Sequence, residues 1–233
     1  MANHALSPKV IEELRSFSTC VIASSIEKFD VRLRNIGFAD SRIKCVFPDL
    51  PPVVGFAATA RMRSSTPPMV GGSYYDRTDW WDHILSIPGP RIVVLEDVDN
   101  PPGLGAFIGE VHAAILHALG CLAVVTNGAV RDLPEVRNQG LQLFAGNIAV
   151  SHAYAHVFEF GGVVQVGKLK IHPGDLLHGD LHGVNQVPIE IAEKIPQTAR
   201  EILHARRHLV DLCRSDRFNR EALRAEIRKI DSQ

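Results

Sequence analysis

The stretch GEVHAAILHALGCLAVVTNGAVRD, residues 109–132, decides the fold. Its first half predicts an amphipathic helix closed by Gly120, and residues 122–126 predict a buried strand that ends in an Asn127-Gly128 turn. The apolar residues recur at helical spacing and mark the predicted buried face: Val111, Ala114, Ile115, Ala118 and Leu119. A helix of about eleven residues rises roughly 16 Å, and a strand of about six residues returns roughly 20 Å. The end of the strand should therefore lie beside the first turn of the helix.

This geometry brings two polar groups together, residues 109–112 and the pair Arg131-Asp132. The first turn of a helix exposes unpaired N–H groups that favour a carboxylate. Arg131 adds a charged fork that suits the carboxylate and carbonyl oxygens of a 2-oxo acid. Asp132 and Glu110 offer hard oxygen ligands, and Mg²⁺ needs only one or two carboxylates because it keeps several waters. The sequence therefore predicts a site for an anion and a divalent cation.

The same residues can also be explained by structural roles alone. An Arg-Asp pair after a turn commonly forms a surface ion pair of little energetic worth. A glutamate in the first turn of a helix is also explained by the helix dipole alone.

Composition places the chain among globular proteins of near-neutral charge. Its 233 residues include 45% hydrophobic and 22% charged residues, with a formal net charge of −1. A chain without a broad cationic field is not expected to bind nucleic acid or an anionic membrane. It contains no run of roughly 18 apolar residues, and its four cysteines form no CxxC pair, so we expect a cytoplasmic protein without disulfides.

The remaining elements follow from local signals. Ser7-Pro8 should open the first helix, and a second helix is expected over residues 21–29. Strands are predicted over residues 53–62 and 91–96. From Pro188 onward the sequence becomes charged and helical. We therefore expect a catalytic domain over residues 1–188 and a helical extension over 189–233 that packs on the domain or on a neighbouring subunit.

Two weaker motifs are set aside. Eleven histidines are more than a chain of this size usually carries, and His178 and His182 flank Asp180 like metal ligands. The neighbouring glycines argue for strands and turns, so we interpret these two as ordinary turn histidines. Gly103 and Gly105 begin a glycine pattern, but its spacing does not fit a dinucleotide-binding loop.

One family shares the spacing of these motifs. Glu110, twenty intervening residues and Arg131-Asp132 resemble the acidic-X20-Arg-Asp signature of the RraA-like family. Gly161-Gly162 and the ending Pro173-Gly174-Asp175 with residues 179–184 resemble the same family over about residues 53 to 188. That family includes 4-hydroxy-4-methyl-2-oxoglutarate aldolases that also decarboxylate oxaloacetate.

The resemblance implies a fold, an activity and a site. The fold would be an α/β swivelling β/β/α domain with helical segments at both ends. The activity would be that of a carbon–carbon lyase dependent on Mg²⁺ or Mn²⁺, which cleaves a 2-oxo acid through a metal-stabilised pyruvate enolate. Arg131 would bind the substrate, Asp132 the metal directly, and Glu110 the metal through water. Residues Gly109, Glu110, Val111 and His112 would contact the substrate, and homotrimers or hexamers would carry the sites at subunit interfaces.

Three departures leave alternatives open. Asn127-Gly128 stands where the family commonly has Asp-Gly, Glu110 where many aldolases have aspartate, and His112 where leucine is usual. The chain could instead be a non-catalytic regulator that binds a ribonuclease, or a related enzyme acting on a different carbonyl acid. The acid, the arginine and the aspartate are all retained, which favours the lyase.

Overall fold

A computed structural model describes residues 6–68 and 77–231. The helical elements are α1 (Pro8–Arg15), α2 (Thr19–Glu27), α3 (Thr78–Ser86), α4 (Glu110–Ala118), α5 (Leu133–Asn138), η1 (Ile189–Ile191), α6 (Ile195–Cys213) and α7 (Arg220–Asp231). The strands are β1 (Lys44–Cys45), β2 (Val53–Arg63), β3 (Arg91–Asp97), β4 (Ala106–Ile108), β5 (Cys121–Val130), β6 (Gln142–Ile148), β7 (His156–Phe160), β8 (Val164–Val166), β9 (Leu169–Ile171), β10 (Leu176–Asp180) and β11 (Gly183–Val187).

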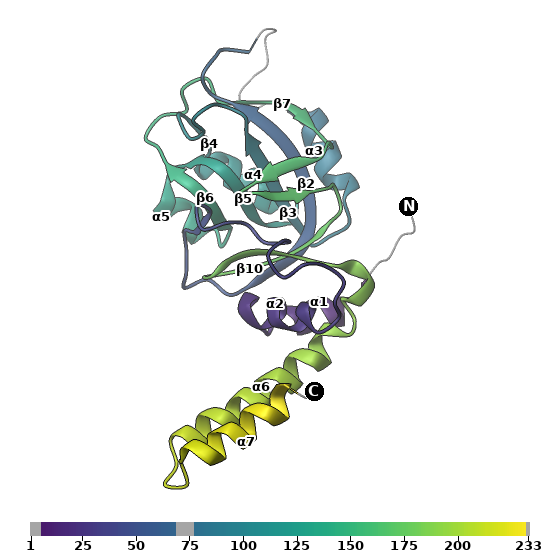
Figure 1. Ribbon diagram of the computed structural model, residues 1–233. Coiled ribbons are helices and arrows are strands. Elements are labelled where there is room, and N and C mark those ends of the chain that lie inside the picture. The colour runs from purple at the N-terminus through teal and green to yellow at the C-terminus, as the bar shows by residue number, and fades with distance from the viewer. Residues whose placement is uncertain (1–5, 69–76, 232–233) are drawn as a thin grey trace.

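One strongly curved, nearly closed sheet forms the body of the molecule (Figure 1). Its strands follow the order β1-β6-β5-β3-β2-β10-β11, with β4 added beside β5 and β7 beside β2. The central strands β2, β3, β5 and β6 run parallel, whereas β10 and β11 are antiparallel. The predicted α/β class and the helical segments at both ends are confirmed.

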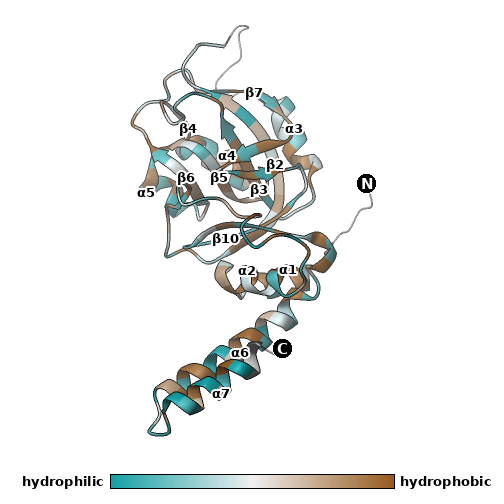
Figure 2. Cartoon of the chain, viewed as in Figure 1, coloured by the Kyte–Doolittle hydropathy of each residue, from teal (hydrophilic) through white to brown (hydrophobic). Residues whose placement is uncertain are grey.

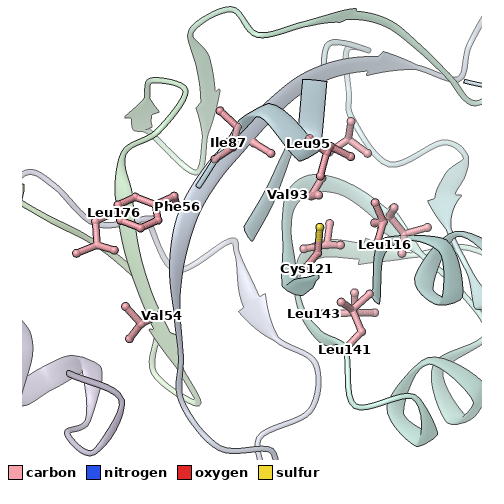
Figure 3. Packing of buried hydrophobic residues seen from close by; sticks show 14 of the residues in the cluster. Val54, Phe56, Ile87, Val93, Leu95, Leu116, Cys121, Leu141, Leu143 and Leu176 are labelled. Atoms are coloured by element: carbon pink, nitrogen blue, oxygen red, sulfur yellow. The ribbon is translucent and has the colours of Figure 1, made fainter. Parts of the chain in front are cut away.

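Two apolar layers hold the sheet. The larger layer packs the outer face of the sheet against the helices and includes Val93, Leu116 and Leu143 (Figure 3). The smaller layer lies on the opposite face, where the β8–β9 hairpin covers residues such as Val94 and Val125. Strands with two covered faces read as continuous apolar runs, which explains the composition of β3 and β5.

Most local predictions are confirmed. The Ser7 hydroxyl accepts a hydrogen bond from the Val10 N–H at 3.3 Å, and Pro8 is the first residue of α1. Strands β2, β3 and β5 cover the three predicted strand segments. Gly120 adopts a φ of +75° just after α4, as expected of a glycine that ends a helix.

The buried face of α4 was predicted wrongly. The structure buries His112, Ala113 and Leu116, whereas Val111 on the predicted face is 49% exposed. Apolar residues occupy both faces of this helix, so periodicity alone favours the wrong one. The buried face meets Phe107 of β4, where the His112 ring centre lies 4.2 Å from the Phe107 ring centre.

The predicted Asn127-Gly128 turn is also wrong, because both residues lie inside β5. The register of β5 shifts between Thr126 and Ala129 in its pairing with β6. At the end of β3, the Asn127 side chain makes the hydrogen bonds to the Asp97 backbone that a neighbouring strand would otherwise make. Its Oδ1 accepts from the Asp97 N–H at 2.8 Å, and its Nδ2 donates to the Asp97 carbonyl at 2.8 Å. Asn127 and Gly128, which are typical of turns, thus form a bulge within β5.

The helices α6 and α7 form a hairpin that projects away from the body (Figure 1). Both carry hydrophobic as well as hydrophilic residues (Figure 2). The buried residues of α6 are confined to its start, at Ile195, Pro196 and Ala199. Within residues 6–68 and 77–231, no helix has the length and apolar character needed to cross a membrane. The division into a domain of residues 1–188 and an extension stays a prediction.

Candidate active site

The ends of β4 and β5 bring the two predicted polar groups into contact. The strands run parallel, with Ile108 opposite Val130, and the Arg131 N–H donates to the Ile108 carbonyl at 2.9 Å. Helix α4 begins two residues after Ile108, so its first turn lies against Arg131 and Asp132. The convergence expected from the helix and strand lengths is therefore present in the structure.

We call the meeting point of residues 109–112 with Arg131 and Asp132 the corner. The Asp132 carboxylate joins its two sides. Its Oδ2 accepts a hydrogen bond from the Glu110 N–H at 3.1 Å. The residue precedes α5 in a left-handed conformation, with φ 52° and ψ 46°, and its side chain makes no capping bond to that helix. A non-glycine residue in this region carries a conformational cost, and such residues often occur at functional sites. Here the strained backbone directs the carboxylate toward α4.

The electrostatics favour the charged form of this carboxylate. Burial alone raises the pKa of the Asp132 carboxyl, but hydrogen bonds from the Glu110 N–H and Arg131, with the charges of Arg131 and His152, lower it below its usual value. An ionised carboxylate at the start of a helix is also stabilised by the helix dipole. Asp132 is thus available as an anionic ligand.

Arg131 lies beside Asp132 and keeps part of its guanidinium available. Its Nε donates to Asp132 Oδ1 at 3.0 Å, and the two side chains are 29% and 31% exposed. In the described part of the chain, the terminal nitrogens of Arg131 make no hydrogen bond. This outer edge of the guanidinium matches the two oxygens of a carboxylate.

Gly109 allows the close approach of the two segments. A Cβ at this position would lie 2.5 Å from Asp132 Oδ2 and 3.0 Å from Arg131 Cγ. Its φ of −140° is ordinary extended backbone, so space and not conformation requires glycine here. The glycine therefore keeps the corner open for the Asp132 carboxylate.

The other predicted contact residues lie in different surroundings. The Glu110 side chain is exposed at the start of α4, and Val111 is 49% exposed on the outer face of the helix. His112 is only 3% exposed, and its ring contacts Phe107. A ligand at the corner would thus contact the backbone of His112, because the imidazole ring of this residue lies in the interior.

Two further residues lie near the corner. His152 lies with Nδ1 2.9 Å from the Ala106 carbonyl, and its charge acts on Asp132. Gln139 donates from Nε2 to the Glu110 carbonyl at 3.2 Å and ties α5 to α4. Neither residue has a sequence signal of its own, because each is brought in by the tertiary fold.

The donor atoms at the corner fit a hard divalent cation. The Asp132 carboxylate is a hard oxygen ligand, and the exposed side chain of Glu110 belongs to the residue whose N–H bonds to it. Mg²⁺ or Mn²⁺ would fill the rest of its coordination shell with water or substrate oxygens. No group of three or more His, Cys, Asp or Glu residues is arranged around a common metal position in the described residues. A soft or fully protein-enclosed metal therefore does not match this corner.

The histidine motif around Asp180 has a structural role. His178 is fully buried inside β10, with Nε2 3.1 Å from the Leu14 carbonyl and Nδ1 2.9 Å from the Thr19 hydroxyl. Asp180 accepts from the Thr19 N–H at 2.9 Å. The interpretation as turn histidines is wrong for His178, whose hydrogen bonds link β10 to α1 and α2.

Comparison with known proteins identifies the family. The family model named RraA-like and described as Aldolase/RraA matches residues 19–185. The chain belongs to the RraA-like family. The region that matches this family includes the whole corner from Gly109 to Asp132 and leaves α1, η1, α6 and α7 outside.

Solved structures similar to this RraA-like chain confirm the fold. An uncharacterised protein from Pseudomonas syringae pv. tomato has a TM-score of 0.72 at 20% identity, with 94% of each chain covered. A structure described as novel cellulases from gut-associated microbes also reaches 0.72 at 20% identity, covering 88% of each chain. Streptomyces coelicolor RraAS2, described as an unusual member of the RNase ES inhibitor RraA family, reaches 0.67 at 19% identity over 87% of this chain and 96% of its own. No curated protein matches the chain.

Proposed function

We propose that the protein is a divalent-metal-dependent lyase that cleaves a carbon–carbon bond of a 2-oxo acid bearing a second carboxylate. One observation carries the proposal. The Asp132 carboxylate, the first turn of α4 and the Arg131 guanidinium meet at a single corner, with Glu110 N–H 3.1 Å from Asp132 Oδ2 and Arg131 Nε 3.0 Å from Oδ1. A permanent cation and an ionised carboxylate side by side suit a substrate anion and a metal cation together.

Each residue at the corner has a distinct part. Asp132 would hold the cation directly, and Glu110 would reach it through water. A bound Mg²⁺ or Mn²⁺ supplies Lewis acidity that stabilises the enolate charge left when the C–C bond breaks. Arg131 orients the substrate carboxylate through the outer edge of its guanidinium. The N–H groups of the first turn of α4 add a partial positive charge against the same anion.

An exposed apolar group beside the corner favours a site shared between subunits. Leu104, Ile148 and Val150 are 60%, 67% and 94% exposed. The backbone N–H of Ala149, which lies between Ile148 and Val150, donates to the Val130 carbonyl at 3.1 Å, so these two side chains lie beside the residue that precedes Arg131. Gly103, the neighbour of Leu104, lies against Asn147, the neighbour of Ile148. Exposed apolar side chains gathered at one edge are typical of interaction surfaces. We propose that a second copy of the chain covers this edge in a trimer or hexamer.

The test measures pyruvate release from oxaloacetate and from 4-hydroxy-4-methyl-2-oxoglutarate, with Mg²⁺ or Mn²⁺ and then with EDTA. We expect metal-dependent turnover that Asp132→Ala abolishes. Arg131→Ala should lower kcat/KM by several orders of magnitude, because the substrate carboxylate then loses its partner. A loss below tenfold would contradict the role of Arg131.

Two results would redirect the assignment. Inactivity on both substrates together with tight binding to a ribonuclease would favour a regulator. Inactivity on both, with activity on another carbonyl acid in a screen of related substrates, would keep the corner and change its substrate.

A further inference from the structure

The histidines of α6 form a feature that the proposed lyase site does not use. His204 and His208 are four residues apart on this helix, and both are exposed. Their ring centres lie 4.7 Å apart, with 63° between the ring planes. Residues at this spacing are neighbours on one helical face. Two imidazoles therefore stand side by side in solvent, away from the corner at Asp132.

Acidic residues extend the same face on both sides of the pair. Glu201 precedes His204 by three residues, Asp211 follows His208 by three, and both are exposed. The Glu201 carboxylate accepts a hydrogen bond from Gln197 Nε2 at 3.0 Å, which keeps it on this face. Arg200 and Arg207 also flank His204 at helical spacing, so the imidazole pair, and not the net local charge, carries the site.

We propose that His204 and His208 together chelate one late first-row transition-metal ion of the Zn²⁺, Ni²⁺ or Cu²⁺ class. Imidazole nitrogen is a preferred ligand of these ions, and two histidines at i and i+4 on a helix are a recurring half of such sites. A metal bonded about 2.0–2.1 Å from each ring nitrogen needs only small side-chain rotations of two rings already in contact. Water occupies the remaining coordination positions.

The histidine site and the candidate active site are expected to prefer different metal ions. Mg²⁺ prefers carboxylate and water oxygens and is expected at Asp132, whereas the imidazole pair selects the softer ions. The described residues bring no third His, Cys, Asp or Glu into position to complete either ligand set. The site on α6 is therefore an open, two-ligand site, independent of the lyase assignment.

Metal binding here would stabilise a segment of α6 that lacks fully buried residues. Beyond Ala199, none of the remaining residues of α6 is buried. A ligand that binds only the helical form of this segment stabilises it by mass action. We therefore expect the amides of residues 202–213 to exchange more slowly in the presence of the metal, by up to about 100-fold at a metal concentration of 100 times the dissociation constant.

The experiment titrates the full-length protein with Zn²⁺ or Ni²⁺ by calorimetry, in a non-chelating buffer. Losing one imidazole removes the advantage of chelation, so His204→Ala and His208→Ala should each weaken binding by about 100-fold. Asp132→Ala should retain the binding. The variant His208→Ala/Val210→His keeps the number of histidines but moves one to another face, and it should also lose the site.

The outcomes decide the proposal. Loss of binding in both single variants and in the relocated pair, with retention in Asp132→Ala, supports the chelate. Wild-type affinity in the relocated variant would overturn it, because spacing would then be irrelevant. Binding that survives His204→Ala/His208→Ala would assign the metal to other groups. Because each readout is binding or exchange, the result stands whether or not lyase activity is found.

Discussion

Gly109 is the residue on which the corner depends most directly. Gly109→Ala would place a methyl group 2.5 Å from Asp132 Oδ2 while leaving a backbone conformation that alanine tolerates. The Asp132 carboxylate must then move, and small misplacements of a reacting group cost about 100-fold in rate. We expect such a loss in kcat/KM, measured with oxaloacetate, in a protein that remains folded.

The matched control is Gly162→Ala, where a Cβ would meet only the end of the flexible Glu159 side chain. Full activity in this control and a large loss in Gly109→Ala would support the close approach. Full activity in both would show that the corner is not the reaction centre.

His178 predicts how stability depends on pH. Burial lowers its pKa to about 4, although bonds to the Leu14 carbonyl and the charge of Asp180 oppose this shift. The unfolded chain therefore binds the proton more readily than the folded one. Stability is complete above about pH 6.5 and is lost as the pH falls toward about 4, by on the order of 3 kcal/mol. Denaturant unfolding at a series of pH values measures this slope.

The control is His178→Gln, which carries no titratable group. We expect it to be less stable at neutral pH but to show a smaller loss on acidification than the wild type. Equal slopes in the two proteins would exclude His178 as the acid-sensitive group.

At the scale of the element, Asn127 extends the pairing between β3 and β5. Asn127→Asp keeps the size of the side chain, yet it cannot donate to the Asp97 carbonyl, which lies 2.8 Å from Asn127 Nδ2. An oxygen would then face an oxygen beside the buried Asp97. We expect a loss of about 1–3 kcal/mol in the free energy of unfolding. Asn147→Asp, at an exposed position with a long 3.4 Å bond to Pro102, should change it little.

The buried face of α4 and the conformation of Asn127-Gly128 differ from what the sequence predicts. Strand and helix positions follow from apolar runs, capping residues and Gly120, all of which are local. The buried face of α4 depends on tertiary packing, such as the contact of His112 with Phe107 of β4. Asn127-Gly128 has the composition of a turn. In the structure, however, the Asn127 side chain forms hydrogen bonds with the Asp97 N–H and carbonyl, and both residues stay in the strand.

The candidate site was more predictable than these details. The lengths of one helix and one strand suffice to bring Glu110 and Arg131-Asp132 together. The contributions of His152 and Gln139 could not be predicted, because they come from segments whose position depends on the whole sheet.

At the scale of the whole molecule, the exposed apolar edge beside Arg131 predicts assembly. Ile148→Asp/Val150→Asp places charges where the two side chains are 67% and 94% exposed, so the subunit itself should fold normally. If this edge joins subunits, the variant becomes a monomer by light scattering and loses activity. Leu85→Asp, at a 50% exposed position of α3, is the control and should keep the wild-type mass. An unchanged mass in the edge variant would rule out this surface as the interface.

The aromatic contacts inside the body have a practical consequence. Trp80 of α3 is fully buried and meets Phe107 edge to face at 5.7 Å between ring centres, and Phe107 in turn contacts His112 of α4. The indole thus stands two contacts from the helix whose first turn faces the proposed ligands. In a Trp81→Phe variant, which leaves Trp80 as the sole indole, fluorescence would therefore serve as a built-in optical probe of loading at the corner, without an attached label.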